Sequence, residues 1–116
     1  MPRDVGLYLD DLLEACHDIR EFTAGLDAVA FAADRRTVLA ILRSLEIAGE
    51  IVKNLPPEML ARAPDVSWRK LIRLRDLLAH AYHRVDLAVI WDVVQNDVPA
   101  LEAAARRLAA EYRCPP

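Results

Sequence analysis

Apolar residues recur at helical spacing over four stretches of the chain. The first covers residues 5–23, and the second covers residues 34–55, where the apolar stripe is broad enough for the interior of a bundle. The third begins near Trp68 and the last follows Asp86. No stretch shows the apolar–polar alternation of a strand. The pattern therefore predicts an all-α protein, an antiparallel four-to-five-helix bundle with short connections.

Caps and prolines predict where these helices begin, bend and end. Asp34 and Asp86 each precede an apolar run, and their side chains can accept hydrogen bonds from first-turn amides. Pro99 lies inside the last helix, so we expect a break or kink at residues 96–98. The third helix is expected to fray or bend around residues 81–84.

Composition adds a cellular context to this scaffold. The 116 residues fit one domain, residues 1–116, and only three of them are glycine, which favours helices. The N-terminal segment leads into no uninterrupted apolar run, so we expect neither a secretory signal nor a membrane span. The two cysteines lie near opposite ends and form no metal-ligand spacing with the three histidines. We expect a cytoplasmic protein with reduced thiols and with no metal or other cofactor. A domain of this size buries a limited share of its surface, so a dimer is a natural way to cover more.

Charge is distributed unevenly along the chain. The net charge of −3 argues against nucleic-acid binding over the whole surface. Acidic residues dominate the first 34 positions, whereas residues 68–84 carry five basic residues and one acidic residue. This segment indicates a local landing site for a phosphate backbone, and an ordinary solvated helix face is the alternative. The candidate RNA-binding residues are Arg69, Lys70, Arg73, His83 and Arg84.

Arg75 falls on the apolar face of the third helix. Its position on the helical wheel coincides with that of Leu71 and Leu78, which should turn inward. A guanidinium on such a face is costly unless it is paired or opens into a cleft. Glu46 and Glu50, one turn apart on the second helix, are candidate partners. Arg75 is therefore either a structural ion-pair residue or a positioned functional cation.

His80 follows Arg75 by five residues, which places it on nearly the opposite side of an unbroken helix. Asp76, one turn earlier, can orient the imidazole and raise its pKa. An exposed histidine without a function is the alternative. For Arg75 and His80 to act on one phosphate, the helix must end near His80, or two protomers must face each other.

The segment RDLLAHAY, which runs from Arg75 through His80 to Tyr82, resembles the R-x4-H-x-Y signature of the HepT toxins, a branch of the HEPN superfamily of small helical ribonucleases. The resemblance extends over most of the chain. It includes YLDDLLEACHDI at 8–19, LRSLEIAGEIVKNLPP at 42–57 and VSWRKLIRLRDLLAHAYHRVDLAVIW at 66–91.

This resemblance implies a helical homodimer in which two Arg75–His80 sets line one cleft and cleave RNA without a metal. His80 would transfer protons and Arg75 would stabilise charge on the phosphoryl oxygens. Tyr82 corresponds to the residue to which a minimal nucleotidyltransferase antitoxin of the MntA kind attaches AMP. The chain would then be the toxin of a toxin–antitoxin pair. Tyr82 as a plain core aromatic is the alternative for that residue.

A second hypothesis belongs to a different class of function. The chain could be a catalytically silent binding subunit of a nucleotidyltransferase, because the acidic N-terminal helix also suits a protein–protein contact. Cleavage of RNA by the purified protein distinguishes the two hypotheses.

Overall fold

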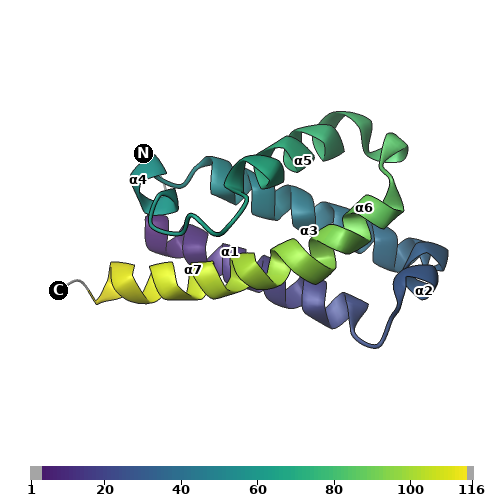
Figure 1. The fold of residues 1–116 in the computed structure, drawn as a ribbon, viewed down its shortest axis with the longest axis horizontal. Helices are drawn as coiled ribbons and strands as arrows, with labels where there is room; N and C mark the ends of the chain where they lie inside the picture. Colours follow the sequence, from purple (N-terminus) through teal and green to yellow (C-terminus); the bar gives the residue numbers. More distant parts are fainter. Residues whose placement is uncertain (1–3, 115–116) are drawn as a thin grey trace.

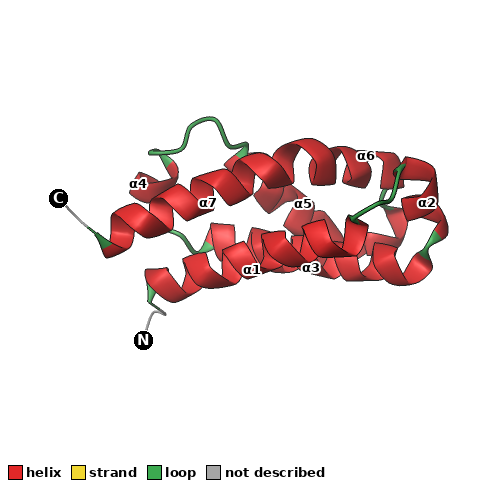
Figure 2. Cartoon of the chain, turned by 90° about the horizontal axis from the view of Figure 1, so that it is seen from below, coloured by secondary structure: helices red, strands yellow, loops and turns green. Residues whose placement is uncertain are grey.

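Four long helices form an antiparallel bundle in the computed structural model, which describes residues 4–114 except for the side chain of Tyr82. They are α1 (Val5–Thr23), α3 (Arg35–Lys53), α5 (Trp68–Ala81) and α7 (Val98–Arg113). Helix α3 lies between α1 and α5, and α7 packs along the other side of α1 (Figure 1). The described part of the chain is entirely helix and loop, as Figure 2 shows. The predicted all-α bundle is confirmed.

Five shorter helical segments lie between the long helices within residues 4–114. They are α2 (Ala28–Ala33), α4 (Pro57–Leu60), the 3-10 turn η1 (Tyr82–Arg84), α6 (Leu87–Asp92) and the π-helical segment η2 (Val93–Asp97). Helix α2 was not predicted from the sequence. Phe31 is its one buried residue, and the ring lies 5.2 Å from that of Trp91, between centroids, which anchors α2 on α6.

The predicted caps and the predicted bend are present. Asp34 accepts hydrogen bonds from the amide and the hydroxyl of Thr37 at the start of α3. Asp86 accepts one from the amide of Ala88 at the start of α6. The π-helical segment η2 ends two residues before Pro99, which has no backbone N–H to donate to the regular helical hydrogen bond. The last helix is thus built in two pieces.

Buried apolar side chains line the contacts between the long helices. Leu9 and Leu12 of α1, Ile41 of α3 and Leu101 and Leu108 of α7 are fully buried. Helix α5 contributes fewer buried residues, Leu71 and Leu78, because much of its surface is charged and exposed. This exposed surface brings the candidate site residues to the outside of the bundle.

Candidate active site on α5

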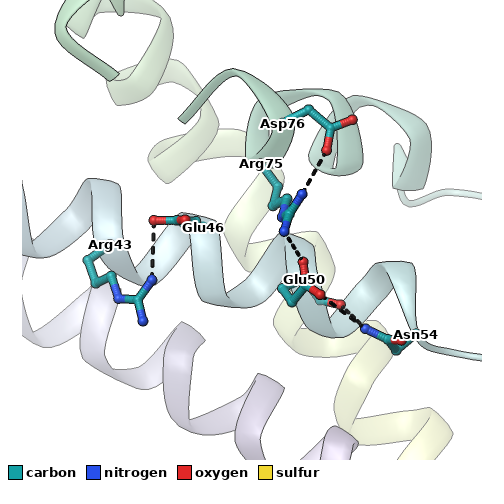
Figure 3. A network of polar contacts seen from close by, with 6 residues as sticks. All are labelled: Arg43, Glu46, Glu50, Asn54, Arg75 and Asp76. Atoms are coloured by element: carbon teal, nitrogen blue, oxygen red, sulfur yellow. Dashed lines mark hydrogen bonds and ion pairs between the residues drawn. The ribbon is translucent and has the colours of Figure 1, made fainter. Parts of the chain in front are cut away.

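Arg75 joins α5 to α3 through its guanidinium. Its Nη2 lies 2.5 Å from Oε2 of Glu50, and its Nη1 donates to Oδ1 of Asp76 at 3.1 Å (Figure 3). The side chain is 23% exposed, so the pair lies at the edge of the helix contact and not within the core. Of the two predicted carboxylate partners on α3, Glu50 pairs with Arg75. Glu46 instead lies 3.3 Å from Nη1 of Arg43, and its predicted role beside Arg75 is not found.

The pairing of Arg75 leaves donors unused. A guanidinium has five N–H groups, and the two carboxylates each accept at one Nη atom. The Nε atom is buried and has no hydrogen-bond partner among the described residues. Arg75 is therefore held in one orientation by two carboxylates, and its Nη atoms retain N–H groups beyond these two contacts.

Arg75 lines a cavity of about 370 Å³ where α1, α3 and α5 meet. Carboxylates of Asp11, Glu46 and Glu50 also line it, together with the amide of Asn54. Asn54 donates from Nδ2 to the backbone oxygen of Glu50 at 2.8 Å, which supports the end of α3 beside the ion pair. The cavity therefore combines these three carboxylates with two guanidinium groups, those of Arg75 and Arg43.

His80 lies one residue before the end of α5 and is exposed. The helix ends at Ala81 and continues as the 3-10 turn η1, as the sequence predicted for this region. The expected Asp76–His80 pair is not formed, because the carboxylate of Asp76 accepts from Arg75. Five residues along a helix correspond to a rotation of about 140° and a rise of about 7.5 Å. Within one protomer, Arg75 thus faces α3 whereas His80 faces solvent.

The structure separates the basic residues of this region into two groups. Arg69, Arg73 and Arg84 are exposed and form no ion pair within the described part of the chain, and His83 is exposed as well. Lys70 is different, because its Nζ donates to Asp97 at 2.7 Å. This hydrogen bond raises the pKa of the lysine. The role of Lys70 in RNA binding stays a prediction, and its ion pair with Asp97 distinguishes it from the three unpaired arginines.

Two residues near Arg75 were missed in the sequence analysis. Asn54 supports Glu50, and nothing in the helical periodicity points to it. Gly49 lies at the contact between α3 and Arg75, and its signal is a glycine inside a strongly periodic helix. The side chain of Tyr82 lies outside the described part of the structure, and only the backbone of this residue is placed, at the start of η1.

Residues 4–114 lack two features that would mark other classes of site. They contain no group of three or more His, Cys, Asp or Glu side chains placed to hold a metal ion. None of the helices in this range combines the length and the apolar character that crossing a bilayer requires.

A family model described as ribonuclease HepT-like matches residues 12–108, a range that includes Arg75, His80 and Tyr82. The chain belongs to the HepT-like family. Among HepT-like relatives, the "Probable ribonuclease HepT" of Thermococcus cleftensis is 41% identical over 108 residues, covering 93% of this chain and 98% of the relative. A "Putative RNase" of Methanocaldococcus jannaschii is 44% identical over 100 residues, covering 85% of this chain and 83% of the relative. No solved structure shows a significant match to this HepT-like chain.

Proposed function

We propose that this chain is an endoribonuclease, the toxin of a toxin–antitoxin pair acting in the cytoplasm, in which Arg75 and His80 carry out metal-independent cleavage of RNA. Family membership and the names of the relatives support the ribonuclease activity. The observation that carries the assignment of residues is the state of Arg75. It is oriented by two carboxylates, retains unused N–H groups on its Nη atoms and lies about 1.4 turns before an exposed histidine.

The proposed reaction is attack by a ribose 2′-hydroxyl on the adjacent phosphodiester. A base removes the proton of the 2′-hydroxyl as its oxygen forms a bond to phosphorus. The bond from phosphorus to the 5′-oxygen then breaks, and an acid delivers a proton to that oxygen. The products are a 2′,3′-cyclic phosphate and a 5′-hydroxyl. His80 serves as the group that transfers protons, which contributes about 10²–10⁴ in rate. Arg75 stabilises the charge that develops on the non-bridging oxygens.

A second protomer is part of the proposed active site. Because Arg75 and His80 of one chain face different sides of the helix, a homodimer supplies the arrangement in which both groups reach one phosphate. In such a dimer, Arg75 of one protomer and His80 of its partner act on the same phosphate, so each active site takes one residue from each chain. The exposed Arg69, Arg73 and Arg84 hold the RNA backbone on either side of the cleft.

The proposed off-switch is Tyr82. Attachment of AMP to this tyrosine by an MntA-type nucleotidyltransferase antitoxin places a bulky anion two residues after His80. The added phosphate repels the RNA backbone and blocks access to the cleft. The adenylyl group comes from ATP, with the tyrosine oxygen forming a bond to the α-phosphorus and pyrophosphate leaving.

The test is RNA cleavage by purified protein in the presence of EDTA. Wild type should cleave and leave cyclic phosphate ends, and a substrate with deoxyribose at the cleaved position should stay intact. Arg75→Ala and His80→Ala should each lower the rate at least about 100-fold, the range of a missing charge-stabilising or proton-transfer group.

Two further experiments test the shared cleft and the nuclease activity separately. Equal mixtures of the Arg75→Ala and His80→Ala chains should recover part of the activity if the dimer shares its cleft. Wild-type protein that leaves RNA intact while Tyr82 still accepts AMP would contradict the nuclease proposal and favour the silent binding subunit.

A further inference from the structure

Gly49 is a glycine in the middle of the long helix α3. It is buried, its backbone is helical and its φ is not in the left-handed region. A glycine at such a position weakens a helix relative to alanine, because it adds conformational freedom to the unfolded chain. A glycine is therefore required at position 49 because a side chain would not fit there, and not because the backbone adopts an unusual conformation.

Helix α5 occupies the space that a side chain at position 49 would need. A Cβ atom built on Gly49 overlaps Cβ of Arg75 and lies 2.9 Å from the carbonyl oxygen of Leu71 and 3.1 Å from Cγ of Arg75. Non-bonded carbon atoms pack at about 3.5–4.0 Å. The nearest obstacles are the Cβ atom and backbone of α5, which cannot rotate away as a flexible side-chain end would. The two helices must separate if any other residue replaces Gly49.

Gly49 and Glu50 contact the two ends of the same side chain. The glycine accommodates the Cβ and Cγ atoms of Arg75, and the next residue pairs with the guanidinium. The closeness of the helices at Gly49 therefore sets how far the guanidinium reaches toward Glu50.

We propose that Gly49 is a positioning residue for the reaction, acting through Arg75. This inference rests on the proposed catalytic role of Arg75. A methyl group at position 49 displaces α5 locally by about 1 Å, and a misplacement of that size at a reacting group costs about 100-fold in rate. The substitution should lower kcat more than it raises KM, because the exposed cationic residues that hold RNA lie on the other face of α5.

The experiment compares Gly49→Ala, Arg75→Ala and the double variant in RNA cleavage under single-turnover conditions, with circular dichroism and thermal unfolding of each. The control is Leu42→Ala, which truncates a buried side chain that lines a small cavity with Leu78 between α3 and α5, away from Arg75. Gly49→Ala should keep its helical signal and lose about 30- to 100-fold in kcat. Leu42→Ala should unfold at a lower temperature than wild type and stay within about threefold of its rate, measured where both are folded.

The double variant separates a role through Arg75 from a general structural one. If Gly49 acts through Arg75, adding Gly49→Ala to Arg75→Ala leaves the residual rate unchanged, since interacting residues are not additive. A loss that multiplies with that of Arg75→Ala, a Gly49→Ala chain within threefold of wild type, or one that fails to fold would each overturn the inference. Wild-type rates for Arg75→Ala would instead contradict the proposed function.

Discussion

Replacing Glu50 by alanine or by glutamine separates its two effects on Arg75, which are the hydrogen-bond acceptor and the negative charge that it provides. Alanine removes the acceptor that holds the guanidinium, whereas glutamine keeps an acceptor oxygen of similar reach and removes the charge. Glu46 lies one turn earlier on the same helix and pairs with Arg43, so Glu46→Ala removes a carboxylate from the same cavity without touching Arg75. It is the matched control.

The expected effects follow from the exposure of the pair. Arg75 is 23% exposed and Glu50 is 49% exposed, so the pair is largely wet and Glu50→Ala should cost about 1 kcal/mol of unfolding free energy. That corresponds to roughly 4 °C in Tm for a domain of this size. The freed guanidinium should lower kcat about tenfold, which is about 1.4 kcal/mol of transition-state stabilisation. Glu50→Gln should keep kcat within about threefold.

The Glu50→Gln protein should also bind RNA more tightly than wild type. A carboxylate at about 8 Å from a phosphate in water contributes about 0.5 kcal/mol of repulsion, so its removal should lower KM roughly twofold. The assay is steady-state cleavage of a fluorescent RNA at fixed ionic strength, combined with thermal unfolding. Glu46→Ala should match wild type in kcat. The reasoning is refuted if Glu50→Ala keeps its full kcat, or if Glu46→Ala loses as much activity as Glu50→Ala.

Three further predictions use contacts away from Arg75. Burial raises the pKa of the Cys16 thiol to about 12, so a thiol reagent at pH 8 should modify the exposed Cys114 alone in folded protein and both cysteines after unfolding. The hydrogen bonds that cap α3 lower the pKa of Asp34 below 3.8, so the stability they add is present at neutral pH and is lost as the pH falls through the lowered value. Asp34→Ala should therefore lower Tm at pH 7, with a difference from wild type that vanishes in acid. Lys70→Met should leave RNA cleavage within about twofold, whereas Arg73→Met should raise KM several-fold and reduce its salt dependence, because the charge of Lys70 is paired with Asp97 and that of Arg73 forms no ion pair within residues 4–114.

Helical periodicity was sufficient to predict the four long helices. Each carries enough buried apolar residues for the 3.6-residue period to stand out, and Asp34, Asp86 and Pro99 mark boundaries by local chemistry that does not depend on tertiary contacts. Helix α2 was not predicted, because its sequence, AVAFAA, contains one buried residue and no polar face and so shows no helical periodicity. Its position depends on the contact between Phe31 and Trp91, which lie 60 positions apart in the chain.

The pairing of the site residues was less predictable than their placement on helices. Glu46 and Glu50 lie on similar faces of α3, and the choice between them depends on how α3 and α5 are rotated and shifted against each other. Likewise, the spacing of Asp76 and His80 permits a pair, but the carboxylate binds the neighbouring guanidinium instead. A helical wheel describes one helix at a time, so it cannot show which residue of one helix will pair with a given residue of another.

The partial exposure of the Arg75–Glu50 ion pair allows Arg75 to have both a structural and a catalytic role. A buried ion pair could not exchange its partner for a phosphate without a large desolvation cost. The ion pair with Glu50 is exposed to solvent and contributes only about 1 kcal/mol to the free energy of unfolding. Charge-assisted hydrogen bonds from the guanidinium to a phosphate are at least as strong. Arg75 can therefore tie α5 to α3 in the resting protein and still turn one edge to RNA. The two roles that the sequence presented as alternatives are compatible at this exposure, and deeper burial of the same pair would have separated them.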